Sequence, residues 1–253
     1  MELSIFTMLR GFAGEFGRIQ RNGIGSWLEL EPRPEVVLFD EVRGAKTLAK
    51  RLGVALYPVA RNEFGSGLVN DAWARAAEVC SGDVLACVHA DIILLGDFVP
   101  AVEACAERFE EFLAVARRRD VWIKGRLEFD AGRRRWRAGV MRRAMDGRWH
   151  SPRGIDVFVW RGDFWGEVPA FAVGKCAHDN WMVGRALEVG VPVVDLTPAT
   201  MVVHQNHISG HVRSGPEYER NQALMGGCNG GVGDAGWVVG MDGKVTRITG
   251  QNG

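Results

Sequence analysis

The chain has 253 residues and no net formal charge, with 47% hydrophobic and 25% charged residues, which predicts a folded domain with a large core and excludes a disordered chain. It has neither a basic leader followed by an apolar stretch nor an apolar run long enough to span a bilayer, so we expect no signal peptide and no membrane anchor. Its five cysteines show no CxxC spacing, which indicates free thiols in a reducing compartment, the cytoplasm.

Up to about residue 115, short apolar segments alternate with longer amphipathic ones. Apolar strands separated by helices are typical of a parallel sheet covered on both faces, so we expect a nucleotide-binding half here. The expected strands are Ile5–Thr7, Val36–Phe39, Val54–Pro58 and Val84–Val88. The expected helices are Glu15–Leu30, Gly44–Leu52, Gly67–Cys80 and Phe98–Phe109.

The segment from residue 117 to 153 is strongly basic. It holds 13 lysines and arginines against four aspartates and glutamates. Such an excess attracts an anionic acceptor, a lipid head group or nucleic acid to one face, although most basic segments are simply solvated surface. No nucleic-acid recognition motif accompanies the charge, so nucleic acid is not an expected partner.

The rest of the second half is less regular. A hairpin is indicated near the end, where Asp242-Gly243 separates two short strand-like segments. The expected elements are a strand at Ile155–Trp160, a helix at Asn180–Val189, a strand at Val191–Asp195, an apolar run at Thr200–Val203, a helix at Glu217–Met225, and hairpin strands at Trp237–Met241 and Lys244–Ile248.

The most informative feature is an apolar strand that stops at one carboxylate. Asp91 follows the strand Val84–Val88 closely and is followed at once by the apolar Ile92–Leu94. A buried, unpaired carboxylate is costly, so Asp91 requires a cation, a metal ion or several hydrogen bonds. We favour a metal ion that carries phosphates. The alternative, in which Asp91 only caps the turn after the strand, fits the sequence equally well.

Polar residues also follow the other strands. No Gly-x-Gly-x-x-Gly motif follows the first strand and no Gly-Lys-Ser/Thr loop occurs, which argues against a dinucleotide dehydrogenase and a P-loop enzyme. Open α/β sheets bind ligands at the carboxyl ends of their strands. We therefore expect one crevice to be formed by Thr7–Gly14, Asp40-Glu41, Arg61–Gly65 and His89–Asp91.

Three histidines lie close together in the chain, at His204, His207 and His211. Imidazole is a common metal ligand, and His204 ends an apolar run, so we expect it to complete the coordination of an ion held by Asp91. A zinc site with His204 and His207 is an alternative, but the Glu of a His-Glu-x-x-His motif is missing. For His207 and His211 we expect hydrogen-bonded loop positions near the surface.

Seven segments, taken in order, form a recognisable set: Ile5-Phe6-Thr7, Ile19-Gln20-Arg21-Asn22 with Ser26-Trp27, Arg61-Asn62-Glu63-Phe64-Gly65, Ala90-Asp91-Ile92-Ile93-Leu94, Gly154-Ile155-Asp156, His178-Asp179-Asn180-Trp181 and Val203-His204-Gln205-Asn206-His207. This set resembles the motifs of GT-A glycosyltransferases, and specifically those of a bacterial GT-A-like group. The resemblance covers nearly the whole chain and implies an α/β fold with a Rossmann-like, mixed but mostly parallel sheet flanked by helices, and a small C-terminal hairpin. It implies a single domain, with a nucleotide-binding half at 1–115 and an acceptor-binding half and tail at 116–253.

The resemblance also implies roles for single residues. Asp91 and His204 would hold Mn²⁺ or Mg²⁺, although His89 stands where the family has the first aspartate of its metal motif. Asp179 would act as general base, unless it only caps the helix that it opens. The donor would contact Thr7, Asp40, Glu41, Arg61, Asn62, His89 and Ala90, for several of which a surface-loop role fits as well. The sugar or the acceptor would contact Asp156, Trp165, Asn180 and Trp181, although the tryptophans fit a core equally.

The function implied is transfer of a sugar, with inversion, from a UDP- or GDP-linked donor to a hydroxyl acceptor that is anionic or lipid-linked. A cytoplasmic enzyme, peripheral at the inner membrane surface, would fit these partners. Two rivals remain open at this point. One is a metal-dependent nucleotidyltransferase or hydrolase, and the other is a degenerate module that binds sugar or lipid without catalysis.

Overall fold

The computed structural model describes residues 1–129, 133–208 and 214–249. His211, for which a surface loop was expected, lies outside these ranges. Within them, no helix combines the length and the apolar character that crossing a membrane requires.

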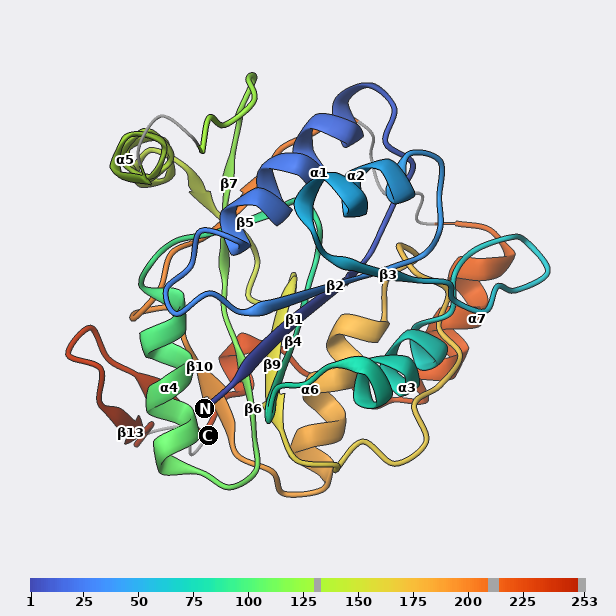
Figure 1. Cartoon of the computed structure of the whole chain (residues 1–253). Helices are drawn as coiled ribbons and strands as arrows, with labels where there is room; N and C mark the ends of the chain where they lie inside the picture. Colours follow the sequence, from blue (N-terminus) through green and yellow to red (C-terminus); the bar gives the residue numbers. More distant parts are fainter. Residues whose placement is uncertain (130–132, 209–213, 250–253) are drawn as a thin grey trace.

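A nine-stranded sheet forms the centre of the molecule, in the order β13-β12-β10-β6-β9-β4-β1-β2-β3 (Figure 1). In this sheet β9 and β13 run opposite to the other strands, so the sheet is mixed but mostly parallel, as expected. The strands are β1 (Leu3–Met8), β2 (Glu35–Phe39), β3 (Ala55–Tyr57), β4 (Val84–Val88), β6 (Phe112–Val115), β9 (Val157–Arg161), β10 (Val193–Asp195), β12 (Trp237–Val239) and β13 (Val245–Arg247).

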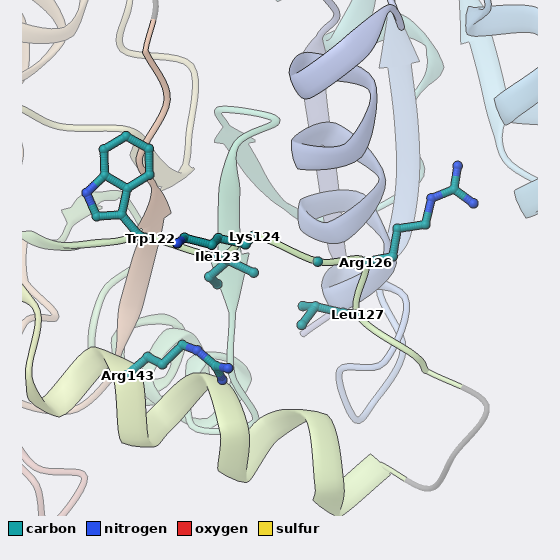
Figure 2. A pocket seen from close by; sticks show the side chains of 7 residues that line it. Trp122, Ile123, Lys124, Arg126, Leu127 and Arg143 are labelled. Carbon is teal, nitrogen blue, oxygen red and sulfur yellow. The ribbon is translucent and has the colours of Figure 1, made fainter.

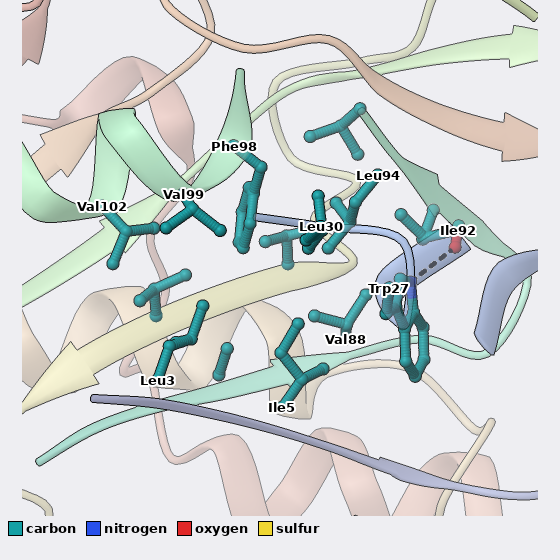
Figure 3. Close-up of a cluster of buried hydrophobic side chains, with 14 of the residues drawn as sticks. Leu3, Ile5, Trp27, Leu30, Val88, Ile92, Leu94, Phe98, Val99 and Val102 are labelled. Atoms are coloured by element: carbon teal, nitrogen blue, oxygen red, sulfur yellow. Dashed lines mark hydrogen bonds between the residues drawn. The ribbon is translucent and has the colours of Figure 1, made fainter. Parts of the chain in front are cut away.

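Helices cover both faces of this sheet because side chains alternate along each strand. Ile5 of β1 packs with α1, α2 and α4 in one core cluster, and its neighbour Phe6 packs with α3 and α6 in another. Figure 3 shows part of the first cluster, which brings Trp27 and Phe98 together with Ile5 and Val88. The helices are α1 (Gly14–Trp27), α2 (Ala45–Leu52), α3 (Val69–Val79), α4 (Phe98–Arg108), α5 (Arg133–Met145), α6 (His178–Glu188), α7 (Pro216–Met225) and the 3-10 turn η1 (Val232–Asp234).

A second, four-stranded sheet has the order β5-β11-β7-β8. Its core cluster unites Ile93 of β5 and Val203 of β11 with Trp136 and Val140, which lie on the inner side of α5. In Figure 1, α5 stands beside β7, away from the main sheet. The strands are β5 (Ile92–Leu94), β7 (Arg118–Val121), β8 (Arg148–Trp149) and β11 (Val202–Gln205).

The basic segment is therefore not merely solvated surface, which corrects the more general expectation for it. It supplies two strands and a helix of the second sheet layer. Arg118 of β7 is buried, with 7% of its surface exposed. The charge that dominates the segment had hidden the apolar spacing Trp136, Val140 and Ala144, which follows one side of a helix.

Helix α1 packs directly on the backbone that carries Asp91. The indole N–H of Trp27 donates a hydrogen bond of 3.0 Å to the carbonyl of Ile92 (Figure 3), and the amide of Leu94 donates one of 3.1 Å to Ser26 Oγ. A side chain at Gly23 would place its Cβ 2.4 Å from the carbonyl oxygen of Ala90. Glycine at this position thus permits the close approach of helix and strand.

A Gly23→Ala variant tests this contact. Because backbone on both sides of the contact must move, we expect the free energy of unfolding to fall by about 1–3 kcal/mol, despite the better helix propensity of alanine. Urea unfolding followed by circular dichroism measures the change.

Gly139→Ala, in the helix α5, is the matched control. Its added Cβ meets a single flexible arginine atom, Arg143 Nη1, at 3.5 Å. This variant is expected to be neutral or to gain up to about 1 kcal/mol. Equal effects of the two substitutions would contradict the proposed packing of α1.

Candidate active site

Strand pairing brings Asp91 next to His204. The backbone leaves the main sheet after β4, passes through His89, Ala90 and Asp91, and enters the second sheet at Ile92. There, β5 pairs with β11 in antiparallel register, with Ile92 opposite His204. The amide of Gln205 also donates a hydrogen bond of 3.2 Å to the carbonyl of Asp91. The two residues that the sequence analysis selected as metal ligands are thus neighbours, because β5 begins directly after Asp91 and pairs with the strand that carries His204.

Asp91, His204 and His207 form a candidate metal site. Asp91 Oδ2 lies 3.6 Å from His204 Nε2 and 3.8 Å from His207 Nε2, and the three donor atoms lie within 4.8 Å of one another. Asp91 Oδ1 is buried without a hydrogen-bond partner among the described residues. The side chain of His207 is 7% exposed, so the expected surface position of this residue is wrong.

A second carboxylate stands behind His204. Asp120, from β7, places Oδ1 3.2 Å from His204 Nδ1. Burial lowers the pKa of His204, but Asp120 and Asp91 outweigh it and raise this pKa to about 9. Burial likewise raises the pKa of Asp91, but the adjacent His204 prevails and lowers it to about 2. A carboxylate on the far nitrogen is the arrangement that orients a metal-binding imidazole.

Arg118 joins the carboxylates of two parts of the chain. Its Nε lies 3.2 Å from Asp120 Oδ1, and its Nη1 donates to Asp156 Oδ2. The other oxygen of this carboxylate, Asp120 Oδ2, lies 2.7 Å from His150 Nδ1. Arg118 and Asp120 are two residues apart in β7 and therefore lie on the same side of the strand. A buried guanidinium thus neutralises carboxylates that would otherwise repel each other.

Asp156 holds His89 in place. His89 Nδ1 lies 2.8 Å from Asp156 Oδ1, while Arg118 occupies the other oxygen. Burial raises the pKa of Asp156, but Arg118 and His89 together hold it well below its usual range. For His89 the lowering by burial is outweighed by Asp156, so its pKa is raised. Both oxygens of Asp156 already have a partner within the protein, and its contact with sugar or acceptor hydroxyls stays a prediction.

Helix α6 begins at the site with His178 and Asp179. Ala177 occupies the N-cap position with φ 76°, so Asp179 is not the N-cap residue that one interpretation of the sequence required. Asp179 Oδ1 is buried and has no hydrogen-bond partner among the described residues. The ring of His178 packs 5.7 Å from that of His89, and burial lowers the pKa of His178. Asp179 therefore has a carboxylate oxygen without a hydrogen-bond partner at the start of the helix, among the described residues.

Three other residues expected to contact substrate have partners within the protein, and their contact with a substrate stays a prediction. Trp165 and Trp181 are 5% and 7% exposed and stack within the core cluster that α6 covers. The side-chain amide of Asn180 donates hydrogen bonds to the carbonyls of Arg153 and Gly230, at 3.0 and 2.8 Å. Packing therefore covers the two rings, and backbone carbonyls occupy the N–H groups of the Asn180 amide.

The expected donor residues lie around the carboxyl ends of β1, β2 and β3. Thr7 is buried at 1% exposure. Asp40 is also buried, with φ 80°, and pairs with Arg61, which partly offsets the burial that raises the pKa of Asp40. The side-chain amide of Asn62 donates a hydrogen bond of 2.8 Å to Glu217, and Glu41 forms an ion pair with the exposed Lys46. Together with His89 and the buried Ala90, these positions remain a prediction for donor binding.

Sequence reasoning missed several residues that surround the candidate metal site. They are Arg118, Asp120, His150 and His178, whereas His207 entered only in the zinc alternative. The alternation Arg118, Arg119, Asp120, Val121 is compatible with a strand that presents opposite charges on one side. Because this alternation lies among several arginines, the sequence alone does not distinguish it from solvated surface.

No family model matches the chain, and neither does any curated protein. Several solved structures do match. S. aureus TarS 1-349 in complex with UDP-GlcNAc is 13% identical, with a TM-score of 0.58 over 90% of this chain and 66% of that chain. S. aureus TarS is 11% identical, with a TM-score of 0.53 over 81% of this chain and 37% of that chain.

GalNAc-T7 with UDP, GalNAc and Mn²⁺ is 14% identical, with a TM-score of 0.56 over 89% of this chain and 48% of that chain. The chain covers less than two thirds of the length of each of these three structures. At such identities the likeness concerns the fold. The chain has the fold of the GT-A glycosyltransferases, with a large, mostly parallel sheet flanked by helices.

Proposed function

We propose that this protein is a metal-dependent glycosyltransferase that moves a sugar from a UDP- or GDP-linked donor to a hydroxyl group of an acceptor. The observation that carries the proposal is the cluster of Asp91, His204 and His207 at the end of β4. The fold supports it, because TarS was solved with UDP-GlcNAc and GalNAc-T7 with UDP, GalNAc and Mn²⁺. Ligands bind at the carboxyl ends of strands in open α/β sheets, which is where this cluster lies.

The donor atoms of the cluster fit a divalent ion. Asp91 offers an oxygen without a partner, and His204 and His207 offer two imidazole nitrogens. This mixed set suits Mn²⁺ better than Mg²⁺, which prefers oxygen ligands. When bound, such an ion neutralises charge on the diphosphate leaving group. Asp120 would keep His204 oriented toward the ion, and Gln205 would fix the backbone of Asp91.

His89 takes a different role from the aspartate that it replaces. Its side chain is one-third exposed, and Asp156 fixes its Nδ1. The raised pKa favours the imidazolium, so Nε2–H is available to donate to an oxygen of the diphosphate. Arg118 supports this indirectly, because it holds Asp156 from the other side. We propose that His89 binds phosphate and leaves metal binding to the triad.

We propose that Asp179 activates the acceptor. Its free carboxylate oxygen would take the proton of the acceptor hydroxyl while that hydroxyl oxygen attacks the anomeric carbon. The bond from the anomeric carbon to the diphosphate breaks at the same time, and the nucleoside diphosphate leaves. Attack on the face opposite the leaving group inverts the anomeric configuration.

The two halves of the chain share this task. We assign donor binding to residues 1–115, which carry Asp91, and acceptor binding to residues 116–253, which carry Asp179 and both metal-binding histidines. The site lies where the halves meet, since β11 pairs with both β5 and β7. Such a junction allows one ion and one base to act on two substrates.

Replacing Asp91 by Asn removes the charged ligand and is expected to weaken Mn²⁺-dependent UDP binding at least about 100-fold, since even groups behind metal ligands cost 10–100-fold. Calorimetry with UDP, with and without Mn²⁺, measures the loss. Asp163→Asn, at an exposed position outside the site, is the control. Unchanged Mn²⁺-dependent binding in Asp91→Asn would remove the metal argument.

Metal binding is expected to depend on pH through His204. Because its pKa is raised to about 9, a proton occupies this ligand below that pH and must leave when the metal binds. Between about pH 6.5 and 8.5 the Mn²⁺ affinity is expected to rise roughly tenfold per pH unit. Without metal the sign is opposite: the ion pairs of His204 stabilise the fold below pH 6.5, and this stabilisation is lost as the pH rises through 9.

Calorimetric titration of Mn²⁺ at several pH values measures this slope, and thermal unfolding without metal measures the opposite trend. His204→Asn should abolish both. A wild-type Mn²⁺ affinity that stays constant across this range would show that no proton leaves His204 when Mn²⁺ binds, and hence that His204 does not bind the ion.

Replacing Asp179 by Asn is expected to leave Mn²⁺ and UDP binding within about twofold and to lower turnover by roughly 10²–10⁴-fold, the contribution of a positioned base. Turnover is measured as UDP release from a UDP-sugar. The Asp163→Asn protein again serves as control. Wild-type turnover in Asp179→Asn would assign this residue to helix structure alone, and UDP binding without any turnover in the wild type would favour a degenerate binding module.

A further inference from the structure

A sharp turn precedes the helix that carries Asp179. Three of the four residues from 174 to 177 have positive φ, at 74° for Gly174, 64° for Cys176 and 76° for Ala177. Glycine adopts such angles without strain, whereas residues with a Cβ rarely do. Strained backbone of this kind persists only where the surrounding structure enforces it. The turn at 174–177 therefore requires support from other parts of the protein.

Asn221 of α7 bonds the backbone at this turn. Its side chain is fully buried. Its Oδ1 accepts a hydrogen bond of 2.9 Å from the amide of Ala172, and its Nδ2 donates to the carbonyls of Ala172, at 2.9 Å, and Cys176, at 3.0 Å. Asparagine is a poor helix former, and a buried amide without partners is costly. These three bonds explain why an asparagine occupies the middle of α7.

The chain enters the turn from a fixed position. The amide of Val173 donates a hydrogen bond of 3.0 Å to the carbonyl of Gly67, close to the start of α3. The backbone is thus attached to the protein just before the turn begins. Asn221 acts on the short stretch between this attachment and the start of α6, so its bonds decide how the helix is entered.

Helix α7 also contacts a residue of the expected donor site. Glu217, one turn before Asn221, accepts a hydrogen bond of 2.8 Å from the side-chain amide of Asn62. The other oxygen of Glu217 lies 2.8 Å from Lys175 Nζ, within the turn itself. Asn62 is one of the positions predicted to contact the donor. The helix therefore gives the turn a reference point on the donor side of the site.

The turn leads directly into the candidate active site. Ala177 is the N-cap residue of α6, and Asp179 follows two residues later. Between them, the ring of His178 packs 5.7 Å from that of His89, which precedes Asp91 by two residues. Backbone rotation within the turn would swing the start of α6 and with it the carboxylate of Asp179. The direction of this carboxylate thus depends on the conformation of the turn.

We propose that Asn221 is a positioning residue for the reaction, which holds the turn at 174–177 and thereby directs Asp179 toward the acceptor hydroxyl. This inference rests on the proposed function, because it takes Asp179 as the base. Asn221 is fully buried and acts only through the backbone. Misplacing a reacting group by about 1 Å costs on the order of 100-fold in rate. Loss of the Asn221 bonds is therefore expected to lower turnover and to spare donor binding.

In Asn221→Ala, kcat is expected to fall about 10–100-fold, while Mn²⁺-dependent UDP binding stays within about twofold. UDP release from a UDP-sugar measures kcat, and calorimetry measures binding. Glu219→Ala, an exposed change in the same helix, is the control and should behave as wild type. Asn221→Asp keeps the side-chain volume and the bond from the Ala172 amide but loses both donated bonds. It takes the place of the alanine variant should that protein not fold.

A glycine at position 177 separates positioning from a general loss of structure. Glycine adopts positive φ without strain, so the turn needs less support in Asn221→Ala/Ala177→Gly. This double variant should recover kcat at least about threefold over Asn221→Ala, since the two residues are coupled. Ala74→Gly, at an exposed position within α3, should give no recovery in the same background.

Three results would overturn the inference: unchanged turnover in Asn221→Ala, a loss of UDP binding that parallels the loss of turnover, or no recovery of turnover with Ala177→Gly. Failure of the proposed function looks different. The wild type then shows no Mn²⁺-dependent UDP binding, or Asp179→Asn keeps wild-type turnover, whatever the Asn221 variants do.

Discussion

The contact between α1 and the backbone of residues 90–94 sets the geometry of the whole site. Gly23 lets the helix approach the carbonyls of Ala90 and Ile92, and Trp27 then bonds the second of these carbonyls. In the same helix, the side-chain amide of Asn22 donates a hydrogen bond of 2.9 Å to Gln205 Oε1. Gln205 is fully buried, and its own amide donates a hydrogen bond to the carbonyl of Asp91. One helix therefore contacts both the segment that carries Asp91 and the strand that carries His204, two residues of the candidate metal site.

The carboxylates of the site are paired with cationic side chains of the protein itself. Arg118 lies between Asp120 and Asp156, and each of these carboxylates orients one imidazole, His204 or His89. Buried ion pairs rarely add net stability, because desolvation offsets their attraction, but breaking one partner is costly. The network is best understood as a device for orientation. Asp120 and Asp156 are engaged in this way, whereas Asp91 Oδ1 and Asp179 Oδ1 are buried without a hydrogen-bond partner among the described residues.

The sequence predicted the first half of the fold well, because strands such as Val84–Val88 are continuously apolar and their helices are amphipathic. The turn sequence Asp242-Gly243 also predicted the C-terminal hairpin, and the antiparallel pairing of β12 with β13 confirms it. The second sheet was not predicted. In β7 the charged Arg118 and Asp120 face inward, against the usual pattern, and the arginines of α5 masked its inner side. His207 lies in a loop after β11, and three residues of spacing from His204 gave no indication of where that loop turns.

The second sheet explains why these misses matter for function. β5 continues the chain from Asp91, β11 carries His204, and β7 carries Asp120, so the layer that the basic segment completes also carries residues of the candidate metal site. Within that layer, Trp136 and Val140 of α5 are buried, while Arg142 and Arg143 on the same helix are exposed. Lys124 and Arg126 lie in the irregular segment that follows β7 (Figure 2). The basic segment therefore builds the layer through its apolar positions, while its exposed arginines keep their charge at the surface.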